Sequence, residues 1–200
     1  MRTFKPSSPI ELVGSQPSEA PPLDLDGWAV GFRIAHTGLT LSLTPEAGCG
    51  LCVGAERWEL NEVHVHHPSE HTLPSVDARA ELHLVHRNRN DDILVIGVLV
   101  TQSDSLHPGV AEFLASAPAA HEEVFGDGRF APYDLLPAQQ ESLRYVGSLT
   151  TPPFAPGVRW VCMTTPIGAS QAQIEQITSA FPTNACPQSP LGDRPLLRCR

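Results

Sequence analysis

Three neighbouring stretches decide the fold: Arg57-Trp-Glu-Leu-Asn-Glu-Val-His-Val-His66, Arg79-Ala-Glu-Leu-His-Leu-Val-His86 and Ile93-Leu-Val-Ile-Gly-Val-Leu-Val100. The first two are typical of strands, and the third is apolar on both faces, as a central strand covered on each side would be. Shorter strand signals lie at Thr40 to Leu43 and at Val158 to Met163. The sequence therefore predicts a sheet with the third stretch near its centre.

Helix signals are few. Ser170 and Gln173 have the spacing of a capping box, and the helix they begin ends at the next proline. The segment from Val110 to Ala117 is predicted to form one or two further helical turns. Proline accounts for 20 of 200 residues, which also favours strands and loops. We therefore expect a single α+β domain over residues 1–200, with 1–22 as an extended lead-in, in which short peripheral helices flank a large, twisted, mostly antiparallel central β-sheet.

Charge and hydropathy exclude several classes of partner. The chain has 22 acidic and 13 basic residues, a net charge of −9, which argues against nucleic acid and against an anionic membrane surface. No apolar run is long enough to span a membrane. The first residues after Met1 carry no apolar segment of the kind found in secretory signals, so we expect a cytoplasmic protein, although a chain that had lost a leader would look the same.

Histidines gather on two of the predicted strands: six of the nine lie between positions 64 and 86. Side chains two residues apart along a strand share a face, so His64 and His66 point the same way, as do Glu81 and His83 on the next strand. If the two strands are neighbours, three imidazoles meet. Three neutral imidazoles with an open fourth position are the ligands of a catalytic zinc. The alternative is that they are ordinary hydrogen-bonded histidines.

The five cysteines decide little. Cys49-Gly-Leu-Cys52 has no second pair with which to complete a structural zinc site. Cys162 lies in an apolar run, which predicts a buried core residue. Cys186 and Cys199 lie near the end of the chain, and whether they form a disulfide is left open.

Three segments, in this order, resemble the α-class carbonic anhydrases: His64-Val-His-His-Pro-Ser-Glu-His71, Ala80-Glu-Leu-His-Leu-Val-His86 and Tyr145-Val-Gly-Ser-Leu-Thr-Thr-Pro-Pro153. With weaker matches elsewhere, the resemblance extends from about residue 6 to residue 196. It implies a zinc enzyme that hydrates carbon dioxide reversibly to bicarbonate and a proton through zinc-bound hydroxide.

The resemblance also assigns roles. It makes His64, His66 and His83 the zinc ligands, and it makes Thr150 the residue that accepts a hydrogen bond from the hydroxide and passes its own proton to Glu70.

Glu62 and Glu81 are expected beside the ligand histidines, where they fix tautomer and ring orientation. The family's apolar pocket for carbon dioxide corresponds to Val85, Val95, Leu149, Thr151, Val158 and Trp160.

The chain departs from the family in three places. Leu39 stands where active members carry a proton-shuttling histidine, so we expect slower, buffer-dependent turnover, with His36 and His67 as candidate replacements. Glu62 replaces a common neutral amide and should raise the pKa of the zinc-bound water. Phe154 stands where secreted bacterial members place a cysteine, which favours a reducing compartment.

Two other functions stay open from the sequence. One is a catalytically weak or silent carbonic-anhydrase-like binding or scaffolding domain, and the other is a zinc hydrolase with a different small substrate. The expected partner is a small molecule, carbon dioxide or bicarbonate, with no nucleic acid and no membrane span. A homo-oligomer is also open.

Overall fold

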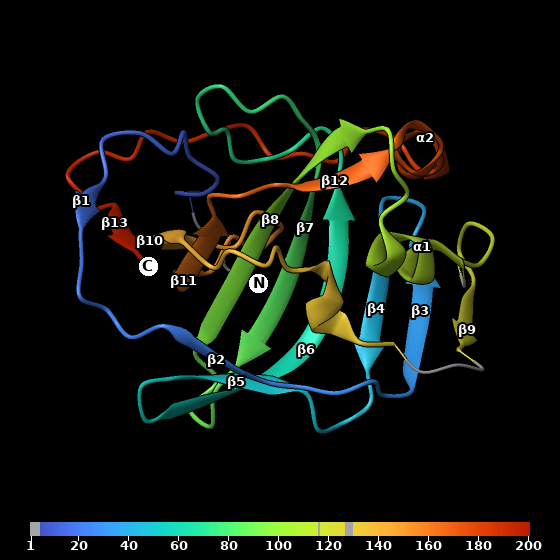
Figure 1. Cartoon of the computed structure of the whole chain (residues 1–200), viewed down its shortest axis with the longest axis horizontal. Coiled ribbons are helices and arrows are strands. Elements are labelled where there is room, and N and C mark those ends of the chain that lie inside the picture. Colours follow the sequence, from blue (N-terminus) through green and yellow to red (C-terminus); the bar gives the residue numbers. More distant parts are fainter. Residues whose placement is uncertain (1–4, 116, 127–129) are drawn as a thin grey trace.

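The structure is a computed structural model that describes residues 5–115, 117–126 and 130–200. Strands dominate this part of the chain, and thirteen of them form one sheet (Figure 1). They are β1 (Gln16–Pro17), β2 (Leu23–Asp26), β3 (Phe32–His36), β4 (Leu41–Pro45), β5 (Gly50–Val53), β6 (Glu56–His66), β7 (Ala78–Arg87), β8 (Ile93–Ser103), β9 (Glu123–Phe125), β10 (Ser142–Ser148), β11 (Pro156–Met163), β12 (Ile167–Ser170) and β13 (Leu197–Cys199).

The sheet is mixed. Its main path runs β1-β13-β10-β11-β8-β7-β6-β4-β3-β9, with β8 near the middle as the apolar run predicts. Most neighbours are antiparallel, but β8 pairs in parallel with both β11 and β12, and β1 pairs in parallel with β13. The expectation of a large sheet with short helices is confirmed, and these parallel pairs are what the strand patterns did not reveal.

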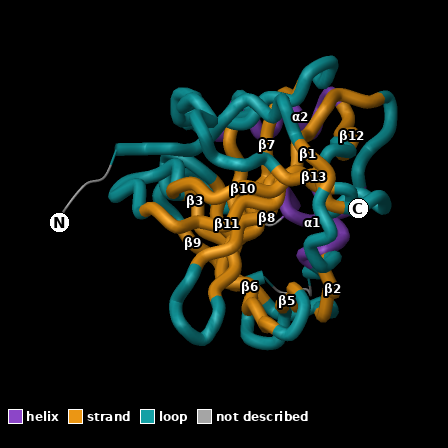
Figure 2. Tube along the Cα trace, turned by 90° about the vertical axis from the view of Figure 1, so that its left-hand side faces the viewer, coloured by secondary structure: helices purple, strands orange, loops and turns teal. Residues whose placement is uncertain are grey.

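The helices are short and pack beside the strands (Figure 2). They are α1 (Pro108–Ala115), the 3₁₀ helix η1 (Pro132–Leu135) and α2 (Gln171–Ala180). The predicted capping box before α2 is confirmed, because the Ser170 side chain accepts a hydrogen bond from the Gln173 backbone and the Gln173 side chain returns one. Of the predicted helix 110–117, residue 116 lies outside the described residues. Within the described residues, none of these helices is long and apolar enough to cross a membrane.

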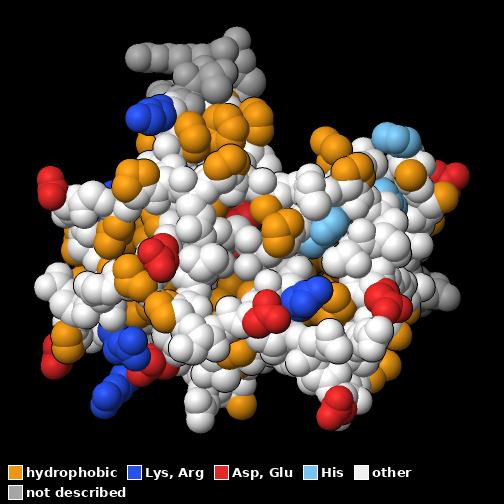
Figure 3. All heavy atoms as spheres, turned by 90° about the horizontal axis from the view of Figure 1, so that it is seen from above, with side chains coloured by type: hydrophobic (Ala, Val, Ile, Leu, Met, Phe, Trp, Pro, Cys, Tyr) orange, Lys and Arg blue, Asp and Glu red, His pale blue; other side chains and the backbone are white. Residues whose placement is uncertain are grey.

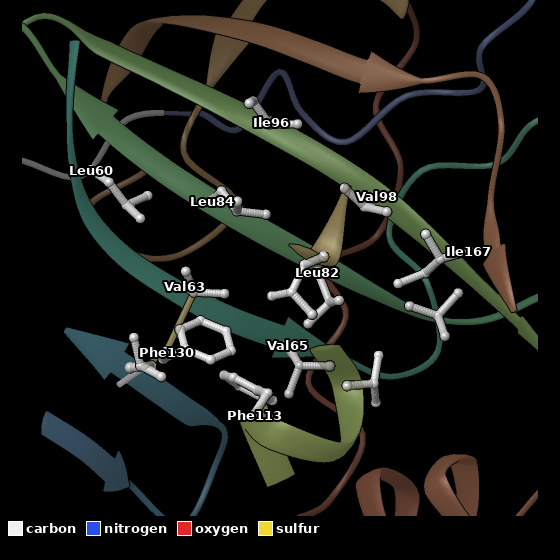
Figure 4. Close-up of a cluster of buried hydrophobic side chains, with 14 of the residues drawn as sticks. Leu60, Val63, Val65, Leu82, Leu84, Ile96, Val98, Phe113, Phe130 and Ile167 are labelled. Atoms are coloured by element: carbon white, nitrogen blue, oxygen red, sulfur yellow. The ribbon is translucent and has the colours of Figure 1, made fainter. Parts of the chain in front are cut away.

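Two hydrophobic clusters lie on opposite faces of the central strands. The larger is covered by α1, α2 and the segment around Phe130, and it includes Val63, Leu82, Leu84 and Ile96 (Figure 4). The smaller includes Val95, Val158 and Trp160. Successive residues of one strand enter different clusters, as the two-residue period of a strand requires. The smaller cluster therefore supports the residues on the second face of the central strands from beneath.

A bulge in β6 decides which face receives the histidines. The register of β6 against β7 shifts after Leu60, so Asn61 is one extra residue on β6. Leu60 before the bulge and Val63 after it both enter the larger cluster, although they are three residues apart. His64 and His66 consequently point to the opposite face.

Candidate metal centre

Three imidazole rings converge from β6 and β7. His64 and His66 lie two apart on β6, and His83 lies directly opposite His64 on β7. The ring centroids are 5.0 Å apart for His64 and His66, 5.2 Å for His64 and His83, and 4.7 Å for His66 and His83. One nitrogen from each ring lies within 4.8 Å of the other two. The structure therefore brings together the three histidines that the spacing predicted.

Glu81 fixes the orientation of His83. Nε2 of His83 donates to Glu81 Oε1 over 2.9 Å, which leaves Nδ1 as the ring nitrogen with a free lone pair. The other carboxylate oxygen accepts from the backbone amides of Glu70 and His71, and the His71 ring donates to Oε1 over 2.8 Å. Burial alone would raise the pKa of Glu81, but His71 and His83 outweigh it and hold that pKa well below its usual range. Glu81 is thus a buried carboxylate with a full set of donors.

His66 has one nitrogen engaged and one free. Its Nδ1 donates to the backbone oxygen of Asn184 over 3.3 Å, whereas Nε2 is buried and has no hydrogen-bond partner in the described part of the chain. Burial, together with the neighbouring His83 and His64, lowers the pKa of His66 to about 2. The ring is therefore neutral at physiological pH, and the unpaired Nε2 is available as a ligand.

His64 lies beside a carboxylate. Its Nδ1 is 3.0 Å from Oε1 of Glu62, which also accepts a hydrogen bond of 2.9 Å from the Ser42 hydroxyl. The His64 ring holds the pKa of Glu62 below its usual value against the opposing effect of burial. Glu62 is therefore ionised near neutral pH.

The donor set fits zinc. Three imidazoles, each with one nitrogen held by or close to an oxygen, match the usual pattern in which a second group fixes the tautomer of each ligand histidine. Imidazole suits zinc better than calcium or magnesium, which prefer oxygen ligands. A buried ring nitrogen without a partner, as in His66, is unfavourable unless something binds it.

A cleft of about 610 Å³ opens onto the rings of His64 and His66. Val85, Leu149 and Thr151 line it, as expected for the carbon dioxide pocket. Val95, Val158 and Trp160 do not reach the surface of the cleft. They are buried in the smaller hydrophobic cluster, against which Val85 and Leu149 pack.

Thr150 and Glu70 lie near the rings without touching each other. Thr150 lines the cleft, and Glu70 is almost fully buried. Oε1 of Glu70 accepts a 2.7 Å hydrogen bond from the Cys186 amide, and Oε2 has no hydrogen-bond partner among the described residues, although it lies 3.9 Å from His83 Nε2. No hydrogen bond joins Thr150 to Glu70 within the same residues.

His36 and His67 are not at the cleft. Both are buried, not exposed on loops, and neither lines the cleft. Nε2 of His36 donates to the Ala180 carbonyl over 2.9 Å, and Nε2 of His67 donates to the Phe181 carbonyl over 2.8 Å. Their ring nitrogens hold the end of α2 in place. Leu39, by contrast, is 64% exposed and lines the cleft.

Residues from the segment after α2 complete the site, and sequence reasoning missed them. Asn184 lines the cleft, and its side chain donates to the backbone oxygens of Leu39 and Val65 and accepts from the His67 amide. Cys186 also lines the cleft, and all five cysteines are free. No local periodicity marks this segment, so only the resemblance over the whole chain could have indicated it.

Charged side chains are spread thinly over the surface. In the view from above, few Lys and Arg side chains are visible, and acidic ones lie among them (Figure 3). This distribution agrees with the net charge of −9.

Comparison with known proteins gives a consistent family. Residues 4–194 match the model of the eukaryotic-type carbonic anhydrases. A carbonic anhydrase of Nostoc sp. is 36% identical over 165 residues, which cover 82% of this chain and 62% of that protein. A carbonic anhydrase of Pectobacterium atrosepticum is 31% identical over 195 residues, which cover 96% of this chain and 79% of that protein.

The solved structures agree. The α-carbonic anhydrase of Photobacterium profundum superposes with a TM-score of 0.90 and 32% identity, and the match covers 96% of this chain and 88% of that one. A hyperthermostable carbonic anhydrase from a hydrothermal vent chimney gives a TM-score of 0.92 at 30% identity, with 98% and 88% covered.

Proposed function

Because the chain belongs to the eukaryotic-type carbonic anhydrase family, we propose that it catalyses the reversible hydration of carbon dioxide to bicarbonate and a proton with zinc bound by His64, His66 and His83. The observation that carries the proposal is the unpaired, buried Nε2 of His66 among three converging rings. When bound, zinc supplies hydroxide at neutral pH by lowering the pKa of water to about 7.

The residues around the rings hold each ligand in one tautomer. Glu81 accepts a hydrogen bond from Nε2 of His83, and the Asn184 carbonyl accepts one from Nδ1 of His66. Each lone pair then faces the same point before a metal arrives. This preorganisation supports tight binding without a change in backbone conformation.

Thr150 and Glu70 are proposed to orient the attacking group. Glu70 Oε2 lacks a partner, so it can accept the proton of the Thr150 hydroxyl. The Thr150 oxygen then acts only as an acceptor toward the cleft, which selects one orientation of the nucleophile.

The substrate pocket is proposed to be the apolar wall made by Val85 and Leu149, supported from beneath by Trp160 and its cluster. Carbon dioxide is small, uncharged and apolar, so aliphatic walls suit it and no charged side chain is needed to hold it. Thr151 lies at the edge of this pocket.

The proton that each turnover releases lacks a histidine carrier at the cleft. Leucine at position 39 cannot accept a proton, and the nearest buried candidates, His36 and His67, are hydrogen-bonded to backbone carbonyls elsewhere. We therefore propose that buffer molecules remove the proton and that their concentration limits turnover. The five free thiols support a reducing, cytoplasmic setting as part of the same proposal.

The test is a measurement of zinc per chain and of stopped-flow carbon dioxide hydration in the same preparation, in two concentrations of buffer. We expect one zinc per chain and a hydration rate that rises with buffer. Zinc without hydration would favour the binding or scaffolding domain, and hydrolysis of another small substrate without hydration would favour the zinc hydrolase. A protein that retains no zinc would overturn the proposal.

A further inference from the structure

A second cavity, of about 360 Å³, lies away from the metal centre at the β13–β10–β11 side of the sheet. The segment between β1 and β2 crosses this side of the molecule and contributes Ala20 to the cavity (Figure 1). Apolar side chains of the strands, among them Leu94, Val146, Val161 and Leu197, line most of it. Val146 is 56% exposed, which is unusual for a large aliphatic side chain in the middle of a strand.

Three arginines share this cavity, although the whole chain carries 22 acidic residues against 13 basic ones. Only Arg159 has a carboxylate partner, Glu56, at 2.9 Å. Arg194 donates to four backbone carbonyls, and Arg144 donates to the Pro21 carbonyl and the Ser142 hydroxyl. No Asp or Glu lines the cavity in the part of the chain that the structure describes.

Arg144 has donors to spare. Its Nε and Nη1 make the two hydrogen bonds above, and its Nη2 makes none to the described residues. Burial lowers the pKa of Arg144, whereas the hydrogen bonds that Arg57 donates to Glu59 and Asp26 raise the pKa of Arg57 elsewhere on the surface. The charge of Arg144 is thus half-buried without compensation by a carboxylate.

The strand register places two of the three arginines on the same face of the sheet. Arg144 pairs with Val161 and Val146 pairs with Arg159 across β10 and β11, so the two arginines are diagonal neighbours on one face. Diagonal pairs are within reach of long side chains, and Val146 lies beside both. The cavity therefore combines an apolar wall with two arginine side chains from the same face of the sheet, of which Arg159 also contacts Glu56 and the Trp58 ring.

We propose that this cavity binds a small amphipathic monoanion, a carboxylate with an aliphatic tail, whose head contacts Arg144 and Arg159 and whose tail packs against Val146, Val161 and Leu197. Guanidinium groups bind carboxylates through paired, charge-assisted hydrogen bonds. A cavity of this size, largely apolar with few polar groups, is of the kind that holds small ligands. The net charge of −9 disfavours an extended polyanion, because repulsion grows with every added negative group.

The experiment is calorimetric titration of octanoate into the zinc-loaded protein, with acetate and octanol as ligand controls. We expect one octanoate per chain, with weaker binding of acetate, which lacks the tail, and of octanol, which lacks the charge. Arg144→Gln should weaken octanoate binding about tenfold or more, because it removes a charged hydrogen-bond donor. Arg33→Gln, on β3 at the other side of the sheet and paired with Glu123, is the matched control and should leave binding unchanged.

A second variant guards against misfolding, since Arg144 also holds the segment at Pro21. Val146→Asp places a negative charge in the cavity at an exposed position and should abolish octanoate binding. The cavity takes no part in the hydration of carbon dioxide, so the hydration rate of each variant reports on folding. It also keeps this test separate from that of the proposed function. The proposal would be overturned if octanoate binding survives both substitutions or if acetate binds as tightly as octanoate. A dimer that buries Val146, detected by ultracentrifugation, would overturn it as well.

Discussion

The buried histidines of this protein form two groups that differ in what their ring nitrogens contact. His66 keeps Nε2 without a partner, and the ring faces two others. His36 and His86 are just as buried, but both nitrogens of each ring lie within hydrogen-bond distance of a partner; for His86 these are the Leu84 carbonyl and the Tyr133 hydroxyl. Burial lowers the pKa of His86 to about 4, so it too is neutral. Neutrality and burial therefore do not distinguish a ligand from a structural histidine, whereas an unpaired nitrogen does.

The largest effect on activity is expected from a substitution in the first group, the histidines with an unpaired ring nitrogen. His66→Ala should abolish zinc binding and carbon dioxide hydration together, because two imidazoles are a poor zinc site. Metal analysis after dialysis and stopped-flow hydration measure both. A variant that keeps zinc and most of its activity would show that His66 is not a ligand.

Removal of the group that orients a ligand should have a smaller effect. Glu81→Gln replaces a carboxylate that faces four donors by an amide that cannot accept from all of them. We expect zinc affinity to fall by about 10- to 100-fold. Competition with a chelator gives the affinity, and unchanged affinity with lower thermal stability would reduce Glu81 to a packing role.

Addition of a histidine with free nitrogens at the cleft should increase activity. Leu39→His introduces a proton acceptor at an exposed position on the cleft, so the hydration rate in dilute buffer should rise several-fold and depend less on buffer. Leu106→His is the matched control, because Leu106 is similarly exposed and does not line the cleft. An equal response of the two variants would contradict the proposed limitation.

A change of charge beside a ligand should move the pH profile. Glu62→Gln removes a negative charge 3.0 Å from His64, and a less negative site favours the deprotonated, active form. The midpoint of the pH–rate profile should therefore fall, by less than about one pH unit. A midpoint that stays or rises would mean that Glu62 does not influence the metal electrostatically.

The smallest effect on activity is expected in the second group of histidines. His36→Ala should leave the hydration rate and its dependence on buffer unchanged. The variant loses a hydrogen bond to the Ala180 carbonyl, so the free energy of unfolding should fall by about 1–3 kcal/mol. Urea denaturation measures the loss, and a change in buffer dependence would restore His36 as a proton carrier.

The spacing of His64, His66 and His83 predicted that the three rings converge, because a strand has a fixed period and side chains two apart share a face. The same period explains what was not foreseen. The core residues of β6 are Trp58, Leu60, Val63 and Val65, and the change from a spacing of two to three marks the bulge. That signal was present in the sequence.

The remaining features depend on contacts between distant segments. His36 and His67 are buried because the end of α2 packs over them, and Asn184 reaches back to β6 from more than a hundred residues away. The parallel pairing of β8 with β11 is of the same kind. A pattern within one segment carries no information about which other segment will cover it.

The extra residue in β6 sets which side chains of that strand face the hydrophobic interior and which face the cleft. If Asn61 were paired like every other residue of β6, each later side chain of that strand would change faces, so that the imidazoles would enter the hydrophobic interior and Val63 and Val65 would face the cleft. One unpaired position in the strand thus decides whether imidazoles or aliphatic side chains face the cleft, with every catalytic amino acid unchanged.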